Sequence, residues 1–317
     1  MTKDYVVGID IGGQSVKMGV IDRRGNFLAH FRFDMAKYGK DDTELFLDDI
    51  SKYIRELCDK VGIDNVQGVG IGAPDGNYYD GTIVDAVNLP WAKGKIVPLR
   101  DYISNKVGLP VTVTNDANAA AIGEMTYGNA IGMKNFIEIT LGTGVGSGIV
   151  VDGRLVYGAD GFAGELGHTT AVRYNGRKCG CGKTGCLETY ASSGGVCQTA
   201  REMLETSDMP STLREQNEIT SKDVFDAAVK GDKLAISVFE YTGRILGQKF
   251  ADFVAFSAPE AIIVFGGVAN AGDLLLEPLK RSMEENLVHL WKGKVKVLRS
   301  GLPESDAAIL GAGALAW

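Results

Sequence analysis

The stretch YVVGIDIGGQSVKMGVID, residues 5–22, places two β-rich runs on either side of a glycine turn. Apolar runs of this length around a short Gly-containing connection are typical of two strands joined by a tight turn. A third such run, residues 27–33, follows after RRGN. We therefore expect the chain to open with three consecutive strands.

The stretch FIEITLGTGVGSGIVVD, residues 136–152, starts the same plan again. Here we predict a strand over residues 136–141, a turn formed by GTGVGSG, and two more strands over residues 149–152 and 155–157. Residues 171–185 and 206–220 are expected to be loops. The other predicted helices cover residues 43–61, 99–107, 116–127, 232–257 and the segment from Ser305 onward, and the other predicted strands cover residues 66–71, 111–114, 261–265 and 295–298.

The repeated opening predicts an α/β protein of two like lobes, with a cleft between them where ligands commonly bind. The length of 317 residues agrees, because a single core usually stops growing near about 250 to 300 residues. We expect a smaller lobe made of residues 1–115 plus 305–317 and a larger lobe made of residues 116–304.

Charge and composition exclude several classes of protein. The chain has 40 acidic and 33 basic residues, a formal charge of -7, and no long block of Lys and Arg, which argues against a nucleic-acid surface. Hydrophobic residues make up 45% and charged residues 23%, as in ordinary globular domains. No apolar run reaches the roughly 18 residues of a membrane span, and the start does not resemble a signal peptide. We expect a cytoplasmic protein that binds neither nucleic acid nor membrane.

Three glycine turns follow predicted strands: DIGG at residues 10–13, LGTGVG at 141–146 and FGG at 265–267. Backbone N–H groups of turns without Cβ atoms can converge on phosphate oxygens, and Thr143 adds a hydroxyl donor. The first two turns lead into strands, which separates them from P-loops and dinucleotide fingerprints, and plain hairpin turns are the alternative. Asp10, beside the first turn, suits Mg²⁺ held through water.

Three cysteines and one histidine indicate a metal site. Cys179, Cys181 and Cys186 lie within eight residues, and His168 precedes them by eleven. Three sulfurs and one imidazole make a complete tetrahedral set for structural zinc, and glycines at positions 180, 182 and 185 allow the tight wrap. Incidental buried cysteines and a histidine in an ordinary polar contact are the alternative. A zinc-bound His168 would hold its other ring N–H toward a substrate hydroxyl.

Polar side chains gather at the predicted cleft. Asn115 and Asp116 follow a strand and open a helix, so they are expected to project from the strand end, although either could simply cap the helix. An ionised Asp116 could take the proton of a sugar hydroxyl. Glu165 and Glu188 are tied by spacing to the cysteine segment and could accept hydrogen bonds from hydroxyls; the alternative for each is a solvated loop charge.

Taken together, these segments resemble the ROK family, which groups bacterial sugar kinases with related repressors in the larger sugar kinase, actin and heat-shock ATPase fold. The similarity spans the chain and rests on DIGG, NDANAAA, LGTGVGSG, GELGH, CGCGKTGCLE and FGG. It implies a two-lobed actin-like (ribonuclease H-like) fold, ATP-dependent phosphorylation of a hexose with Asp116 as the base, and zinc that shapes the sugar pocket. GAPDGNYYDGTI with NLPW further resembles the family's glucokinases. Homodimers are common in similar proteins.

The glycine turns and the resemblance together define the expected ligand contacts. Sugar hydroxyls are expected at Asn88, Asn115, Asp116, Glu165, His168 and Glu188. ATP is expected at Gly12, Gly13, Gln14, Gly142, Thr143, Gly144, Gly266 and Gly267, with Mg²⁺ at Asp10 and zinc at His168, Cys179, Cys181 and Cys186.

Two positions depart from the family pattern. Gln14 replaces the threonine that usually ends the first phosphate turn, and Asp75 stands where a glycine is common beside the sugar. The alternatives to a glucokinase are therefore a kinase for another hexose or an N-acetylhexosamine, and a catalytically silent sugar-binding regulator. The family's repressors carry a winged helix-turn-helix ahead of the first strand; only nine residues precede Asp10, which points away from a DNA-binding role.

Overall fold

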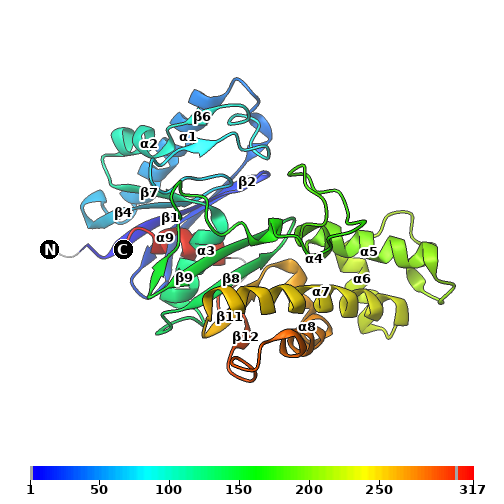
Figure 1. Cartoon of the computed structure of the whole chain (residues 1–317). Helices are drawn as coiled ribbons and strands as arrows, with labels where there is room; N and C mark the ends of the chain where they lie inside the picture. Colours follow the sequence, from blue (N-terminus) through cyan, green and yellow to red (C-terminus); the bar gives the residue numbers. More distant parts are fainter. Residues whose placement is uncertain (1–2, 304–305) are drawn as a thin grey trace.

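The computed structural model describes residues 3–303 and 306–317, and in this part the chain builds two five-stranded sheets one after the other (Figure 1). The first sheet has the order β3-β2-β1-β4-β7 and the second the order β10-β9-β8-β11-β12. In each, the three strands nearest one edge are antiparallel and two later strands add in parallel. The internal repeat expected from the two glycine-turn segments is thus present in the strand order.

The strands of the first sheet are β1 (Tyr5–Ile11), β2 (Ser15–Asp22), β3 (Phe27–Asp34), β4 (Val66–Gly72) and β7 (Val111–Thr114). The strands of the second are β8 (Phe136–Leu141), β9 (Val145–Val151), β10 (Arg154–Leu155), β11 (Ala261–Phe265) and β12 (Lys296–Arg299). A short ribbon pairs β5 (Ile83–Val84) with β6 (Ile96–Val97).

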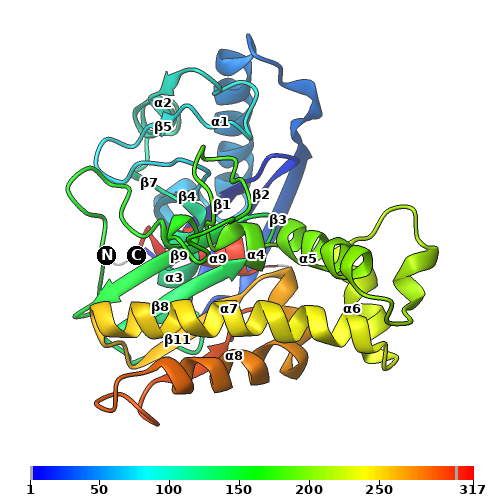
Figure 2. The same cartoon turned by 45° about the vertical axis from the view of Figure 1, so that its right-hand side comes forward.

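Helices cover both faces of each sheet. They are α1 (Thr43–Asp59), α2 (Leu99–Val107), α3 (Asp116–Tyr127), α4 (Glu188–Ala191), α5 (Ser193–Thr206), α6 (Ser221–Val229), α7 (Lys233–Ser257), α8 (Asp273–Asn286) and α9 (Ala307–Ala314). Apolar side chains of α1 and α2 pack on the first sheet, and those of α5 to α8 pack on the second. Helices α3 and α9 lie between the two sheets and contact each other (Figures 1 and 2). Each sheet therefore has its own outer core, and the pair α3–α9 joins them.

The second glycine turn is shorter than expected. Strand β9 begins at Val145 and not at residue 149, because Gly146 and Gly148 pair with Thr140 and Glu138 of β8. A Cβ on Gly146 would lie 2.8 Å from the Cβ of Ala117, and one on Gly148 would lie 2.5 Å from that of Ala121. These glycines belong to the strand and let α3 pack directly on it, so the prediction that they form a turn was wrong.

Several other boundaries differ from the predictions. Strand β10 ends at Leu155, because the ring of Tyr157 stacks on Tyr78 of the first lobe at a centroid distance of 3.8 Å instead of continuing the strand. The segment 206–220, expected to be a loop, contains a short 3₁₀ turn over Thr212–Glu215. Helices α4, α5, α6 and α8 and the ribbon β5–β6 were not predicted. The predicted helix start at Ser305 lies outside the described residues; α9 begins at Ala307.

Within residues 3–303 and 306–317, none of the helices is both long enough and apolar enough to cross a membrane.

Candidate functional site

The first glycine turn and the predicted base lie together at one edge of the first sheet. Strands β1, β4 and β7 are parallel neighbours, so their carboxyl ends lie together. Asp10 is near the end of β1, and Asp116 is the first residue of α3, directly after β7. A Cβ on Gly72, at the end of β4 between them, would lie 3.5 Å from the Cα of Asp116. The fold thus brings together two carboxylates that are more than a hundred residues apart.

The charges of this pair influence each other. Surrounding protein removes water from Asp10 and, together with the negative charge of Asp116, raises its pKa to about 6, against a smaller opposing effect of Lys17. Although Asp116 retains exposed surface, the protein around it removes enough water to raise its pKa above the ordinary 3.8. The N–H of Ala117 donates to Asp116 Oδ1 at 2.8 Å and partly offsets the rise. Such a site attracts a cation or a proton.

Asn115 caps helix α3. Its Oδ1 accepts a hydrogen bond from the N–H of Ala117 at 2.9 Å, which is the capping role considered as its alternative. This contact uses one side-chain oxygen and leaves the amide N–H groups for another partner. Asn115 therefore holds the orientation of the first turn of α3, and with it the position of Asp116.

Asn88 lies against the first glycine turn. A Cβ on Gly13 would come within 3.1 Å of the Asn88 carbonyl, so only a residue without a side chain fits this approach comfortably. Gln14 is exposed, and its carbonyl accepts a hydrogen bond from the N–H of Met35 at 2.9 Å. The turn itself is closed by the N–H of Gly12, which donates to the carbonyl of Ser15 at 3.0 Å.

The second and third glycine turns lie side by side at the end of the second sheet. Gly266 has φ of 96°, and a Cβ there would lie 2.6 Å from the carbonyl oxygen of Leu141, so this position requires glycine. Gly142, Thr143 and Gly267 line a common cavity of about 460 Å³. Helices α5 and α6 complete its wall with Ser193, Ser221, Lys222 and Phe225. These four wall residues of α5 and α6 were not predicted from the sequence, since nothing in their spacing marks them as ligand contacts.

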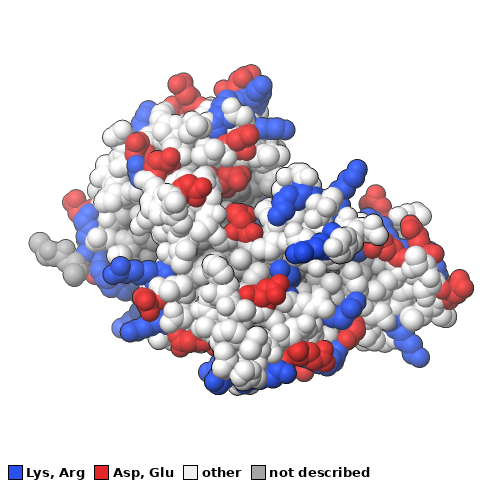
Figure 3. Space-filling view, viewed as in Figure 1, with Lys and Arg blue, Asp and Glu red and all other residues white. Residues whose placement is uncertain are grey.

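Carboxylates from both lobes share the cleft. Burial raises the pKa of Glu165, and the negative charges of Asp75, Asp116 and Glu188 raise it further, whereas His168 lowers it. Asp75 adopts φ of 54°, in the left-handed region that favours glycine, which agrees with the glycine usual at this position of the family. Figure 3 shows acidic side chains along the edge of the hollow between the upper lobe and the projecting loop of the other lobe. The expected sugar-binding acids are thus brought together.

The predicted metal ligands converge. The ligand atoms of His168, Cys179, Cys181 and Cys186 all lie within 4.8 Å of one another. Cys181 Sγ and Cys186 Sγ are 3.7 Å apart, and Cys179 Sγ is 3.7 Å from His168 Nδ1. Tetrahedral zinc with bonds of about 2.0 to 2.3 Å separates its ligand atoms by about 3.5 to 3.8 Å, so the set fits this ion. We call residues 168–186 the metal loop.

His168 and Glu188 connect the metal loop to the cleft. His168 Nε2, on the side away from the sulfurs, is 3.9 Å from Glu165 Oε2. Glu188 Oε2 accepts a hydrogen bond from the N–H of Val145 at 3.1 Å, at the second glycine turn. A Cβ on Gly144 would lie 2.6 Å from the same oxygen. Glu188 thus lies between the metal loop and the second glycine turn.

Comparison with known proteins places the chain in a family. The sequence model of the ROK family matches residues 6–317. The chain belongs to the ROK family. It is 38% identical to the glucokinase of Halalkalibacterium halodurans over 294 residues, which cover 90% of this chain and 86% of that protein.

Solved ROK structures have the same fold. The ROK family glucokinase of Streptomyces griseus, determined in complex with glucose and AMPPNP, superposes with a TM-score of 0.79 at 34% identity and covers 98% of both chains. A ROK family transcriptional regulator, a homologue of the E. coli MLC protein, gives a TM-score of 0.86 at 28% identity, covering 98% of this chain and 77% of that one. The expected two-lobed actin-like fold is confirmed.

Proposed function

We propose that this ROK protein is an ATP-dependent hexokinase that converts glucose and ATP to glucose 6-phosphate and ADP. The observation that carries the proposal is the position of Asp116, which lies beside Asp10 of the first phosphate turn and in the electrostatic field of Glu165 in the other lobe. The glucokinase relatives and the similarity to a glucokinase that binds glucose and AMPPNP support it.

In the proposed reaction, Asp116 accepts the proton of the sugar 6-hydroxyl as that oxygen attacks the γ-phosphorus of ATP. A new P–O bond forms, the bond from the γ-phosphorus to the bridging oxygen breaks, and ADP leaves with that electron pair. Backbone N–H groups of the glycine turns hold the phosphates in line, and Thr143 adds a hydroxyl donor. Closure of the lobes on the sugar excludes water, so that the sugar and not solvent is phosphorylated.

Asp10 is the residue that would hold Mg²⁺. Its carboxylate is largely enclosed, the nearby Asp116 has the same charge, and no ion pair to it is found among the described residues, so a divalent cation suits the site. When bound with ATP, Mg²⁺ offsets the negative charge of the phosphates.

We propose that Asn88, Asn115, Glu165, His168 and Glu188 bind sugar hydroxyls. His168, Cys179, Cys181 and Cys186 would hold a structural zinc ion, which stabilises the folded metal loop when bound. Because the ligand set is complete with four protein atoms, the zinc would serve structure and not chemistry. The two lobes are proposed as residues 1–115 plus 305–317 and residues 116–304.

A silent sugar-binding regulator is the second candidate. The structural similarity to the transcriptional regulator favours it, as does Gln14, which removes a hydroxyl donor from the first phosphate turn. Retention of Asp116 argues for chemistry, because a pure sensor needs no base at the reactive hydroxyl. Asp75 bears on which hexose fits, and kinases for other hexoses or N-acetylhexosamines are tested alongside glucose. We further propose a cytoplasmic homodimer that binds no nucleic acid, which light scattering and a DNA-binding titration test.

The deciding experiment measures ADP release with Mg-ATP and glucose, mannose, fructose, N-acetylmannosamine or N-acetylglucosamine, and identifies the phosphorylated carbon. Asp116→Asn should lower kcat by at least about 10²-fold, or about 2.7 kcal/mol, with sugar affinity nearly unchanged. Asp64→Asn, an exposed change on the first lobe, is the control and should leave kcat unchanged. Full activity of Asp116→Asn refutes the assignment, and sugar binding without turnover in the unsubstituted protein favours the regulator.

A further inference from the structure

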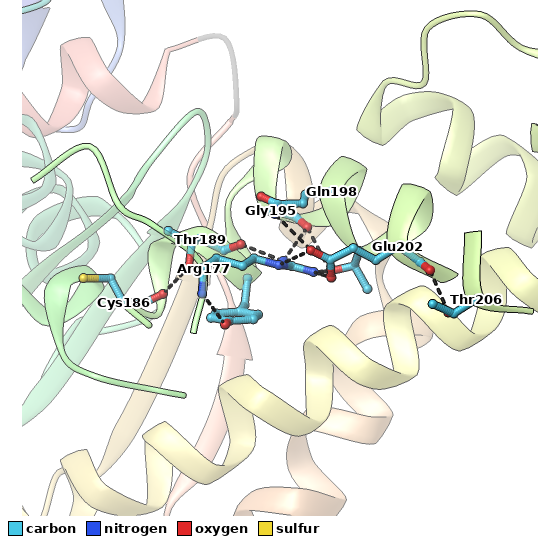
Figure 4. Close-up of polar contacts among 9 residues, drawn as sticks. Arg177, Cys186, Thr189, Gly195, Gln198, Glu202 and Thr206 are labelled. Carbon is cyan, nitrogen blue, oxygen red and sulfur yellow. Dashed lines mark hydrogen bonds and ion pairs between the residues drawn. The ribbon is translucent and has the colours of Figure 1, made fainter. Parts of the chain in front are cut away.

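Arg177 is a buried cation that ties the metal loop to its surroundings (Figure 4). It lies two residues before Cys179, in a segment that reads from the sequence as a charged loop, yet its side chain is only 6% exposed. Its guanidinium makes a bidentate pair with Glu202 of α5, with Nε to Oε1 at 3.0 Å and Nη2 to Oε2 at 2.5 Å. A paired guanidinium in this fork geometry fixes direction as well as charge.

The same side chain also holds the residues that follow Glu188. Arg177 Nη1 donates to the carbonyl of Thr189 at 2.7 Å, and the guanidinium carbon lies 4.4 Å from the ring centroid of Tyr190. The backbone N–H of Arg177 donates to the Tyr190 hydroxyl at 3.0 Å. Both residues after Glu188 are therefore in direct contact with Arg177.

Two further contacts join Arg177 to helix α5. Arg177 donates to the carbonyl of Gly195 at 3.2 Å and to the hydroxyl of Thr199 at 2.9 Å, both on α5. The first turn of α5, which meets the second glycine turn, has its own supports: the N–H of Ser193 donates to the carbonyl of Gly142, and Ser192 caps the helix. The second glycine turn thus has no direct contact with Arg177, whereas the segment that carries Glu188 contacts Arg177 through Thr189 and Tyr190 in addition to its own backbone hydrogen bonds.

We propose that Arg177 is a positioning residue for sugar binding, which acts by fixing Glu188 and the metal loop against α5. The inference rests on the proposed function, since Glu188 is taken as a sugar ligand. Among the described residues, the hydrogen bonds that Arg177 donates reach none of the three glycine turns. Its loss should therefore raise the KM for the sugar more than the KM for ATP.

The test compares three variants. Arg177→Lys keeps the positive charge but cannot make the two parallel hydrogen bonds of the guanidinium to Glu202. Glu202→Gln keeps the shape of the Glu202 side chain but removes its negative charge and so weakens the contact with Arg177. Arg214→Lys is the matched control, because Arg214 also binds several main-chain oxygens, at the far end of α5. Those acceptors are the carbonyls of Leu204, Ser207 and Met209.

Arg177→Lys should raise the glucose KM about tenfold, in the range seen when a residue that orients a ligand-binding group is changed, and the ATP KM by less than about threefold. Glu202→Gln should shift the glucose KM in the same direction by a smaller factor, and Arg214→Lys should shift neither. A glucose KM within about twofold of the unsubstituted protein, or an equal rise of both KM values, would mean that Arg177 only stabilises the fold. If Arg177→Lys does not fold, Glu202→Gln decides on the same criteria.

A second readout separates this inference from the proposed function. The rate at which the zinc-loaded protein gives up its metal to a chromogenic chelator needs no sugar and no ATP. Arg177→Lys should release zinc about tenfold faster than the unsubstituted protein, with Arg214→Lys unchanged. If no hexose is phosphorylated, the proposed function fails, but the zinc-release rate can still be read. A faster release from Arg177→Lys then supports the positioning role, and an unchanged release rate overturns it.

Discussion

Gly70→Ala should destabilise the protein because a methyl group at this position pushes helix α9 away from the first sheet. Gly8 of β1 and Gly70 of β4 are register partners, and α9 crosses directly over both. A Cβ on Gly70 would lie 1.8 Å from the carbonyl oxygen of Ala312, and one on Gly8 would lie 2.1 Å from that of Ile309. The obstructing atoms belong to the backbone, so no side-chain rotation can relieve the overlap.

The size of the effect follows from these distances. To bring the new methyl carbon of Gly70→Ala to even 3.0 Å from the Ala312 oxygen, α9 must retreat by about 1.2 Å. Overpacking of a core usually costs about 1 to 3 kcal/mol. We expect Gly70→Ala to cost about 3 kcal/mol of folding free energy through this overlap. Alanine also lowers the entropy of the unfolded chain, which reduces the cost by about 0.4 to 1 kcal/mol. At about 2 to 4 °C per kcal/mol for chains of about 150 to 250 residues, we expect a fall in Tm of about 5 to 10 °C.

Differential scanning calorimetry at fixed pH and Mg²⁺ concentration measures this change. Gly194→Ala is the control, since Gly194 is an exposed helical residue of α5 whose nearest obstacle is 3.9 Å away, so alanine there should leave Tm unchanged or raise it slightly. A Gly70→Ala protein that melts within about 1 °C of the unsubstituted protein would refute the close crossing of α9 over β1 and β4.

Three other changes test separate parts of the structure. Glu124→Ala removes the buried carboxylate that accepts hydrogen bonds from Asn129 N, Gly301 N and the Ser300 hydroxyl. Because these donors belong to exposed or half-buried residues that water can reach, we expect a loss of about 1 to 3 kcal/mol in the free energy of unfolding in a urea titration, and a loss under about 0.5 kcal/mol contradicts this. Burial, together with the charges of Glu124 and Asp116, raises the pKa of Glu138 well above 4.5 in the folded state. Above pH 4.5 the folded protein therefore keeps a proton on Glu138 that the unfolded chain has lost. The unsubstituted protein loses stability as pH rises through the folded-state pKa of Glu138. Glu138→Gln cannot ionise, so its Tm relative to the unsubstituted protein should increase between pH 5 and pH 8, and a constant difference would be inconsistent with a buried acid. Removal of zinc by a chelator should raise the sugar KM more than the ATP KM, and equal effects on both would speak against a role of the metal loop in the sugar pocket.

Local patterns were sufficient for the sheets and the metal loop. The strands around each glycine turn pair with their neighbours in sequence, so alternation and turn residues predict them without knowledge of distant contacts. The predicted metal ligands lie within nineteen residues of chain, from His168 to Cys186, and the spacing of the cysteines and glycines was enough to predict that they converge.

Predictions failed where a distant segment decides the local conformation. Gly146 and Gly148 read as turn residues, but they are strand residues whose missing side chains make room for α3. Tyr157 reads as the end of a strand, but its ring leaves the strand to stack on Tyr78, 79 residues earlier in the chain. Arg177 lies in the segment 171–185, which was predicted only as a loop, and the fold shows that its side chain is buried and paired with Glu202.

The cleft illustrates what sequence can and cannot say about charge. Asp10, Asp75, Asp116 and Glu165 come from separate parts of the chain, and the family resemblance places them around one ligand site without indicating how strongly their charges affect one another. In the fold, burial raises the pKa of all four carboxyl groups. At Asp10, Asp75 and Glu165 the negative charge of another acid in this group raises the pKa further, whereas at Asp116 burial is the only raising cause. Like charges held this close repel one another. Each ligand in the proposed reaction relieves part of this repulsion: a cation at Asp10 removes one repulsion, and hydroxyl groups that donate to Glu165 and Asp116 remove others. Binding of Mg²⁺ and of sugar hydroxyls is thus favoured by this repulsion, whereas burial is what keeps Asp116 basic enough to take the proton.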